Sequence, residues 1–376
     1  MTGTAQTGPT AHWRGADRLH ERRQRLIEGL GRSGIDGCLV SSDPARTYLS
    51  GFMAASHDVV PVAVLLVGPG QSTLLTSPNN AEWASSEAPG LHVADWVRPW
   101  WGTLADHLSA RGWRTIGFQA SDVSVAAHQA LTAALGDDVS FRDIGGLLDG
   151  MRAIKDDAEI RALARAAAIT DQAFEEVTDR LVAGTTEQDL AWDLTVAMRR
   201  LGAEGSSVIV ASGPNAARPH HAPGPRAIDP GEPVIIDMGA RVDGYLADLT
   251  RTVWVGEPDE TLATIYPIVA EANLVTQAAV RAGVTGRSID DVARSFIAAS
   301  GYADRFVHGV GHGVGLEIHE APSAGPASTD TLLTGHSLTV EPGIYLPGWG
   351  GVRVEDLGIV RDDGFDCLSR ASKRRI

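Results

Sequence analysis

The chain has 376 residues, of which 43% are hydrophobic and 21% charged, and its formal net charge is −15. These proportions are typical of a soluble globular protein with room for two or three domains. The acidic balance argues against nucleic acid as a partner, because phosphate binding needs clustered Lys and Arg. The two cysteines, Cys38 and Cys367, are too few for a disulfide framework, so a reducing cytoplasmic location is expected.

The N-terminal part alternates short apolar runs with helical patterns. A flexible leader is expected over residues 1–16, which have no apolar core. The most apolar stretch, residues 59–68, is too short to span a bilayer, so it predicts a buried strand and no membrane partner. The patterns predict helices over 17–30, 79–87, 100–111 and 124–135, and strands over 37–40, 60–67, 72–76 and 115–118. This alternation predicts an α/β domain with a mixed sheet over residues 17–150.

Residues 151–376 are expected to form a second domain, in which helices pack on antiparallel strands in an α+β pattern. Asp156 followed by Glu159 resembles a capping box and predicts the start of a helix. Pro267 is expected to perturb the helix over about 258–282 unless a kink is tolerated. Further helices are predicted over 186–201, over about 258–282 and from Ser288, and a strand over 207–211.

The segment from Val234 onwards carries the most informative local pattern. An apolar run leads into Asp237, an Asp243-Gly244 pair follows, and a second carboxylate stands at Asp248. Asp-Gly between extended runs predicts a two-residue hairpin turn, which places Asp237 opposite Thr250. Because side chains alternate along a strand, Asp248 then shares a face with Asp237, and both carboxylates reach one metal position. Two carboxylates this close repel each other unless a cation lies between them.

Three further residues supply metal ligands of suitable kinds. His312 lies in a glycine-rich run, Glu341 ends the run 337–341, and Glu355 ends the run 351–355. Both Glu runs alternate apolar and polar residues, as half-buried strands do. Together with the two aspartates they form a set of four carboxylates and one imidazole, whose negative charge would balance two divalent cations. Such an oxygen-rich set favours Mn, Co, Fe or Zn in a hydrolytic pair over a structural zinc.

In this order and spacing, the motifs resemble the creatinase/aminopeptidase P/prolidase family. The resemblance is carried by Asp237, Asp248-Leu-Thr-Arg-Thr, His308-Gly-Val-Gly-His312, Thr339-Val-Glu341-Pro-Gly and Arg353-Val-Glu355-Asp. It covers residues 150–365 closely and the part before them loosely. It implies a C-terminal pita-bread catalytic domain over residues 151–376, preceded by a creatinase-type N-terminal domain over residues 17–150.

The resemblance also implies roles for the five candidate ligands. Asp237 would chelate one metal ion, Asp248 and Glu355 would bridge both, and His312 and Glu341 would bind the second. Glu341 would also handle the proton of the attacking water. The expected cofactors are two divalent ions, with Mn favoured and Co or Zn as alternatives. Such a pair lowers the pKa of a bridging water, polarises the scissile carbonyl and stabilises the tetrahedral oxyanion.

Three other histidines match positions that face the substrate in this family. They are His220, His319, which would hydrogen-bond the substrate carbonyl or the leaving-group nitrogen, and His308. The pair His308 and His312 is not the helical zinc-protease motif, because no Glu follows His308. The remaining histidines are expected to be loop or core residues: His12, His20, His57, His92, His107, His128, His221 and His336.

Two further features bear on the expected pocket. Arg353 shares a strand face with Glu355 and is expected to pair with Asp248 or another ligand carboxylate, or else to receive a substrate carboxylate. A group of N-terminal tryptophans is expected to be mainly core, with a lid over the pocket as the alternative; its members are Trp96, Trp100, Trp101 and Trp113.

The resemblance implies a metallopeptidase, forming a homodimer, that hydrolyses the Xaa-Pro bond of dipeptides, as prolidase does, or of longer peptides, as aminopeptidase P does. That bond has no N–H, so a dedicated site is reasonable. One alternative is a metal-dependent hydrolase or lyase of a small non-peptide substrate on the same fold. A second alternative is a non-enzymatic binding module, and a third is that the carboxylates are surface residues near turns. The presence of all five ligands in order argues against the last two, and metal content would discriminate a metal-dependent enzyme from a binding module.

Overall fold

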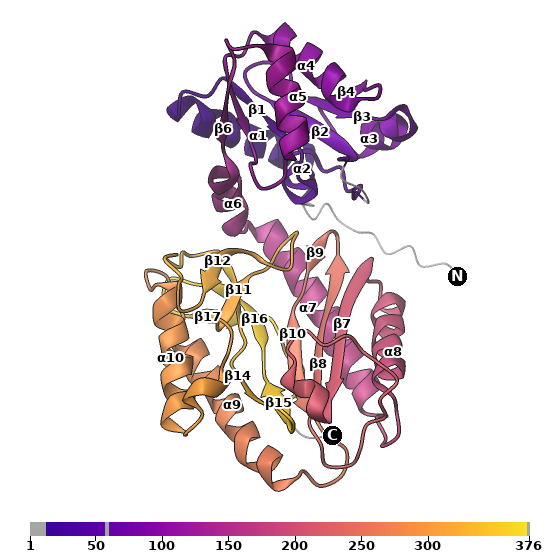
Figure 1. Ribbon diagram of the computed structural model, residues 1–376, viewed down its shortest axis with the longest axis vertical. Helices are drawn as coiled ribbons and strands as arrows, with labels where there is room; N and C mark the ends of the chain where they lie inside the picture. The colour runs from indigo at the N-terminus through magenta and orange to yellow at the C-terminus, as the bar shows by residue number, and fades with distance from the viewer. Residues whose placement is uncertain (1–12, 57–59, 374–376) are drawn as a thin grey trace, which may run out of the picture. The chain divides into compact units, whose positions relative to one another are not determined.

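The computed structural model describes residues 13–56 and 60–373. The chain divides into two compact units between Arg152 and Ala153 (Figure 1). Both cysteines are free thiols. Among the described residues, every helix is too short or too polar to cross a bilayer.

The first unit is built on one six-stranded mixed sheet in the order β4-β3-β2-β1-β5-β6. β2 runs antiparallel to both β1 and β3, and the other neighbours are parallel, which confirms the expected mixed sheet. Its strands are β1 (Gly37–Val40), β2 (Ala63–Val67), β3 (Thr73–Thr76), β4 (His92–Asp95), β5 (Thr115–Phe118) and β6 (Ser140–Asp143). Its helices are α1 (Ala16–Arg32), α2 (Asp43–Ser50), η1 (Pro78–Asn80), α3 (Ala81–Glu87), α4 (Trp100–Arg111), α5 (Val125–Leu135) and α6 (Gly145–Ala153).

The start of this unit differs from the expected leader. Trp13 is only 1% exposed, and the guanidinium of Arg22 lies 5.5 Å from the centre of its ring. The leader predicted over residues 1–16 therefore does not extend over residues 13–16, since an indole buried this deeply is part of a core. Residues 1–12, with His12, and residues 57–59, with His57, lie outside the described residues.

The N-terminal tryptophans are mainly core, as expected. Trp96, Trp100 and Trp113 are between 6% and 8% exposed and pack in one apolar cluster, with Trp101 half-buried against it. The indole of Trp113 covers the backbone of Gly37 and Gly68, where an added Cβ would lie 2.3 Å and 2.4 Å from the ring. These contacts explain why glycines stand at the first residue of β1 and directly after β2.

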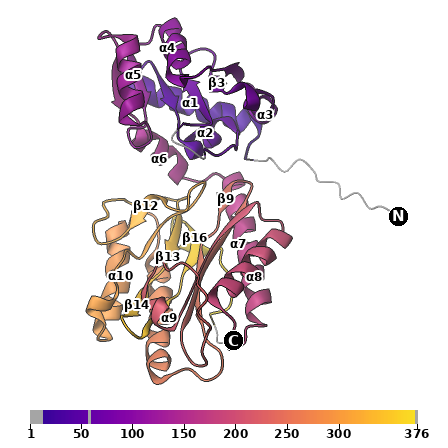
Figure 2. The ribbon, with the colours of Figure 1, turned by 45° about the vertical axis from the view of Figure 1, so that its right-hand side comes forward.

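The second unit consists of antiparallel sheets with helices packed on them, which confirms the α+β class (Figures 1 and 2). Its helices are α7 (Asp157–Thr178), α8 (Glu187–Arg200), η2 (Gly213–Ala217), α9 (Glu260–Ala279), α10 (Gly286–Ala299) and η3 (Ala303–Arg305). Its first strands are β7 (Gly205–Ser212), β8 (Val234–Val242), β9 (Tyr245–Leu246) and β10 (Leu249–Val253). The later strands are β11 (Gly311–Gly313), β12 (Glu320–Ala324), β13 (Ser337–Val340), β14 (Gly343–Leu346), β15 (Gly350–Arg353), β16 (Asp356–Val360) and β17 (Phe365–Cys367).

Two apolar cores hold this unit together. One joins α7 and α8 to β7, β8 and β10, and the other joins α9 and α10 to the later strands. The two helix pairs flank the strands on opposite sides (Figure 2). The candidate ligands lie on the strands between the two pairs or directly beside their ends.

The helix starts follow their capping signals. Asp156 and Glu159 form a complete capping box at α7, and the Thr186 hydroxyl accepts from the Asp189 amide at α8. The helix expected from Ser288 begins two residues earlier, because Thr285 is the N-cap and accepts from the Ser288 amide. Pro267 lies inside α9, which continues on both sides of it.

His336 is a core histidine, and it predicts an acid-sensitive step in stability. Its Nδ1 accepts a hydrogen bond from the Leu333 amide (3.2 Å), so the ring is neutral. Burial and the nearby Lys155 charge lower the pKa of His336 to about 4. A histidine with a folded pKa below its unfolded value near 6.5 stabilises the fold above that value, and this contribution is lost as pH falls towards about 4.

We therefore expect wild-type protein to lose stability relative to His336→Gln as pH falls through this window. Glutamine retains an acceptor and does not titrate. The relative loss is expected to reach a few kcal/mol, because one pKa unit corresponds to about 1.4 kcal/mol. Urea unfolding of both proteins in chelator at several pH values measures it. A constant difference between the two proteins would contradict the prediction.

Candidate metal centre

The hairpin that carries the two aspartates has the register expected from the sequence. Asp243 and Gly244 have φ values of 50° and 83°, as a two-residue turn with two left-handed positions requires. Their amides both donate to the Glu204 carboxylate, at 3.1 Å and 3.0 Å. As a result, Thr250 of β10 pairs with Asp237 of β8. Asp248 lies just before β10 and is 7% exposed.

The two glutamates stand at strand ends. Glu341 directly follows β13, and Glu355 lies between β15 and β16. The expectation of half-buried strands is wrong, because every residue of β13 and β15 is buried. A single side chain from α9 fixes both ends: the Asn273 amide donates to the carbonyls of Val340 (2.7 Å) and Val354 (3.3 Å).

His312 is held on β11 by its own backbone and by its neighbours. Its amide donates to the Thr339 hydroxyl (3.0 Å), and its Nδ1 lies 3.1 Å from the Gly313 carbonyl. A hydrogen bond from Nδ1 leaves the lone pair of Nε2 available for a metal ion. The glycines beside it are required for close packing, since a Cβ at Gly311 would lie 1.9 Å from the Thr339 carbonyl oxygen.

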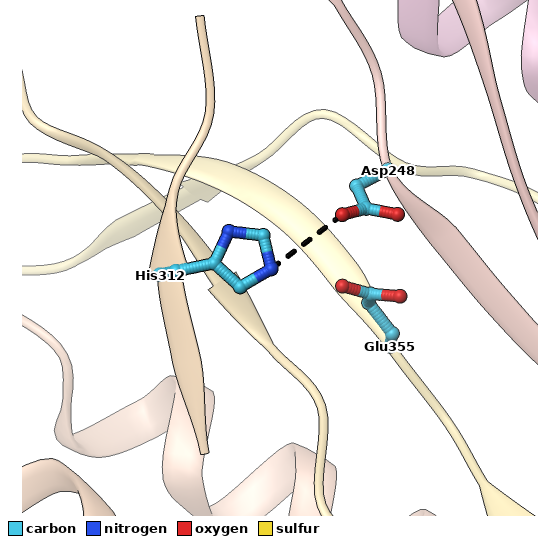
Figure 3. Close-up of side chains that lie close together, drawn as sticks. All are labelled: Asp248, His312 and Glu355. Carbon is cyan, nitrogen blue, oxygen red and sulfur yellow. Dashed lines mark ion pairs between the residues drawn. The ribbon is translucent and has the colours of Figure 1, made fainter. Parts of the chain in front are cut away.

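These elements bring three ligand types together. One ligand atom each of Asp248, His312 and Glu355 lies within 4.8 Å of the others (Figure 3). His312 Nε2 is 3.6 Å from Asp248 Oδ2 and 3.3 Å from Glu341 Oε1. Asp237 lies on β8 and His312 on β11, whereas Asp248, Glu341 and Glu355 lie directly before or after strands. Only the folded chain therefore brings the five candidate ligands together.

The carboxylates of this cluster are placed where a cation would stabilise them. Burial raises the pKa of Glu355 to about 8, and repulsion by Glu341 and Asp237 adds to the effect. Burial likewise raises the pKa of Glu341 to about 7, and burial and the Glu355 charge raise the pKa of Asp248 well above its ordinary value. Such shifts mark carboxylates that lack a compensating positive charge.

The hydrogen bonding of the Glu355 carboxylate indicates whether a metal ion fits this cluster. Oε2 accepts from the Thr250 hydroxyl (2.7 Å), but Oε1 is buried and has no hydrogen-bond partner among the described residues. A buried carboxylate oxygen without a donor is unfavourable unless a cation binds it. The four carboxylates and one imidazole therefore fit divalent metal ions.

Asp237 is oriented by Arg353, which pairs with this candidate ligand, one of the partners expected for it. Arg353 Nη2 lies 2.6 Å from Asp237 Oδ2, and its Nε donates to the Thr250 hydroxyl at 3.1 Å. Its Nη1 donates to the Tyr345 hydroxyl (3.0 Å), which also bonds His308 Nε2 at 2.8 Å. Tyr345 was not predicted from the sequence, because a tyrosine in an apolar strand has the same pattern as a core residue.

Two of the three histidines expected to face the substrate lie against candidate ligands, and the third, His220, is exposed in the loop after η2. His308 Nδ1 lies 4.0 Å from Glu341 Oε2, and the ring of exposed His319 lies 4.3 Å from that of His312. Burial lowers the pKa of His308 to about 4 and also lowers the pKa of His319, and the nearby His220 charge contributes to both. His221, in contrast, is bonded to Glu187 (2.8 Å), as expected of a loop histidine.

We expect Arg353→Met to weaken metal binding about ten- to a hundredfold, because Asp237 would lose the group that orients it. Isothermal titration of the metal-free protein with Mn²⁺ measures the effect. Arg361→Met is the control, since Arg361 makes a comparable ion pair with Asp366 (2.8 Å) that is exposed. Equal affinity in the Arg353 variant and the control would contradict this role.

Comparisons with known proteins agree with this architecture. The model of metallopeptidase family M24 matches residues 161–362, and that of the creatinase/prolidase N-terminal domain matches residues 22–154. The Xaa-Pro dipeptidase of Lactobacillus helveticus is 32% identical over 361 residues, which are 93% of this chain and 96% of that protein. These similarities confirm the expected fold, a pita-bread catalytic domain after a creatinase-type N-terminal domain.

Solved structures are similar over nearly the whole chain. An Xaa-Pro dipeptidase from Bacillus anthracis has a TM-score of 0.89 and 36% identity, covering 95% of this chain and 99% of that one. An X-Pro aminopeptidase from Thermotoga maritima has a TM-score of 0.84 and 32% identity, covering 94% of this chain and 99% of that one.

Proposed function

We propose that this chain, which belongs to metallopeptidase family M24 and is therefore a metallopeptidase, hydrolyses the Xaa-Pro bond of dipeptides or short peptides. The observation that carries the proposal is the buried cluster of Asp248, His312 and Glu355, in which one Glu355 oxygen has no partner among the described residues. The relatives named for dipeptidase and aminopeptidase activity at Xaa-Pro bonds support the substrate class.

Five residues would hold two divalent ions, with Mn favoured and Co or Zn as alternatives. Asp237 would chelate one ion, Asp248 and Glu355 would bridge the two, and His312 and Glu341 would bind the other. The 3.3 Å between His312 Nε2 and Glu341 Oε1 supports their sharing of one ion. The backbone amide of Glu355 donates to the Thr250 carbonyl (3.0 Å), which brings Glu355 beside the hairpin that carries Asp248 and supports a shared role of the two carboxylates.

When bound, the two ions would lower the pKa of a water between them, polarise the scissile carbonyl and stabilise the charge that develops on its oxygen. Glu341 would accept the proton of the attacking water on a carboxylate oxygen and pass it towards the proline nitrogen. His308 Nδ1 lies 4.0 Å from the other Glu341 oxygen, so His308 stands beside the group that would handle this proton. His319 and His220 would donate to the substrate carbonyl or bind its leaving group.

The amide before proline has no N–H, so the site needs no acceptor for one. Recognition must then come from the substrate amine, the carbonyl and the proline ring. A homodimer and a cytoplasmic location stay predictions, which sedimentation velocity and cell fractionation would test.

The test is hydrolysis of an Xaa-Pro dipeptide and an Xaa-Pro-Xaa tripeptide by the full chain, before and after chelation and after reloading with Mn²⁺ or Co²⁺. We expect cleavage that chelation abolishes and metal restores, and the ratio of the two rates chooses between dipeptidase and aminopeptidase. If neither peptide is cleaved while metal is bound, the proposal fails, and a small non-peptide amide becomes the next substrate to test.

A further inference from the structure

A fully buried carboxylate outside the ligand cluster, that of Glu187 in the first turn of α8, organises one loop beside the site. Glu187 is 0% exposed, and among the described residues five hydrogen bonds reach its carboxylate. All five come from residues 212–224, here called the His220 loop. Oε1 accepts from the Ser212 amide and hydroxyl, both at 2.8 Å, and from the Asn215 side chain at 2.9 Å.

The second oxygen of Glu187 binds the far end of the same loop. Oε2 lies 2.8 Å from His221 Nε2 and accepts from the Gly224 amide at 3.1 Å. The backbone closes the contact, because the amide of Gln188 donates to the Gly224 carbonyl at 3.0 Å. One carboxylate thus ties together both ends of the loop.

On its other side the His220 loop rests on β15. An added Cβ at Gly350 would lie 2.8 Å from the Gly213 carbonyl oxygen, and one at Gly351 would lie 2.3 Å from that of Ala216. The glycines therefore allow the loop backbone to lie directly on the strand that leads to Arg353. The loop is held between α8 and β15 and has little freedom to shift.

The carboxylate is ionised in this position. Burial by itself would raise the pKa of Glu187, but the donors from Asn215, Ser212 and His221 outweigh it and hold the pKa below its ordinary value. Hydrogen bonds to a buried charged acceptor are stronger than those between neutral groups. A glutamine could not replace it, because an amide offers only one acceptor oxygen for these donors.

We infer that Glu187 is a positioning residue for His220, which it fixes towards the ligand cluster by binding both flanks of the loop. The ring of His220 is itself exposed, whereas its neighbour His221 is bonded to Glu187. The loop backbone lies against Gly350 and Gly351 of β15, the strand that ends at Arg353, and this contact brings the loop beside the cluster. This inference rests on the proposed function, in which His220 meets the substrate.

The test is a double-mutant cycle on Xaa-Pro dipeptide hydrolysis by the Mn²⁺-loaded chain, with Glu187→Gln, His220→Ala and the double variant. Glu187→Gln is expected to lower kcat/KM about ten- to a hundredfold, as misplacement of a substrate-binding group does. In the His220→Ala background it should lower kcat/KM less than about twofold further, since the residues act as one unit. Mn²⁺ affinity, measured by titration calorimetry, should stay within about twofold in each variant.

Glu159→Gln is the matched control, because Glu159 is 2% exposed and lies in the first turn of α7. Its carboxylate accepts from the Tyr245 hydroxyl and the Asp156 amide, neither of which belongs to the His220 loop. This variant should keep kcat/KM. Should Glu187→Gln fail to fold, Asn215→Ala removes one donor and is expected to give a smaller loss that again vanishes with His220→Ala. Equal losses with and without His220, or weakened Mn²⁺ binding, would overturn the inference.

Amide hydrogen exchange separates failure of this inference from failure of the proposed function. If the wild-type chain cleaves no Xaa-Pro peptide, the proposed function fails. Amide exchange then tests by itself whether Glu187 holds the His220 loop in place. Faster exchange at the Ser212 and Gly224 amides in Glu187→Gln, but not in Glu159→Gln, would then support the positioning role. Unchanged exchange at both amides would overturn it.

Discussion

Glu355→Gln is expected to abolish metal-dependent hydrolysis, with kcat/KM lower by at least about a thousandfold. The substitution keeps the shape of the side chain and its bond to Thr250 but removes the charge that a bridging ligand supplies. Because the carboxylates of the cluster repel one another, removal of one charge should leave the metal-free protein folded and as stable as before or more so. Titration with Mn²⁺ should show weakened binding together with the lost activity.

The control for this substitution is Glu271→Gln, which makes the same chemical change on the exposed side of α9. It should bind metal and cleave substrate like the wild type. Activity of the Glu355 variant within about tenfold of the wild type would show that Glu355 is not a ligand, because the loss of a bridging ligand has a far larger effect.

The second large effect is a loss of stability of the metal-free protein as pH rises. Burial raises the pKa of Glu355 from 4.5 to about 8 and that of Glu341 from 4.5 to about 7. A carboxyl with a raised folded pKa stabilises the fold fully below its unfolded value, and this contribution is lost as pH rises through the folded pKa. The window therefore runs from pH 4.5 to about 8.

Thermal unfolding in chelator at several pH values measures this effect as the difference between Glu355→Gln and wild type, which removes the contributions of titrating groups outside the cluster. As pH rises across the window, the Tm of the variant relative to that of the wild type should increase by roughly 10 °C. The shifts correspond to several kcal/mol of unfolding free energy, and each kcal/mol changes Tm by about 2–4 °C. Added Mn²⁺ should stabilise the wild type most at the alkaline end. A difference that stays constant, or that shrinks with rising pH, would contradict the electrostatic description of the cluster.

Local signals in the sequence predicted the hairpin correctly. The Asp243-Gly244 pair sets the turn, the turn sets the register, and the register pairs Asp237 with Thr250. The capping residues Asp156 and Thr186 likewise marked helix starts, because a cap depends on residues within one turn. Features of this kind need no knowledge of the rest of the chain.

Features that depend on distant contacts could not be predicted. β13 and β15 are buried because α9 packs on both of them, while β11 also packs on β13 and η2 also packs on β15. An alternating pattern does not reveal these contacts. The polar edge strands β4 and β6 lack an apolar run and were missed for that reason. In the first unit, α2 and α6 were missed because α2 begins with Asp43-Pro44 and α6 contains three glycines, which are signals of turns.

The supporting residues of the site were also hidden in the sequence. Asn273 and Glu187 each occupy one polar position in a helix, where a solvent-facing residue is the ordinary interpretation. Their partners are separated from them in sequence by 67 residues for Val340 and 25 residues for Ser212. The candidate ligands could be predicted only from the order and spacing of their motifs. The residues that hold them in place could be identified only from the folded structure.

The most direct test of the central claim is a titration of the chelated protein with Mn²⁺, in which bound metal and Xaa-Pro dipeptide hydrolysis are followed in the same samples. Two ions per chain should bind, activity should rise as they bind, and neither should occur in Glu355→Gln. Full hydrolysis by protein that holds no metal, or two ions bound equally well by Glu355→Gln, would contradict the claim that this cluster is a dinuclear catalytic centre.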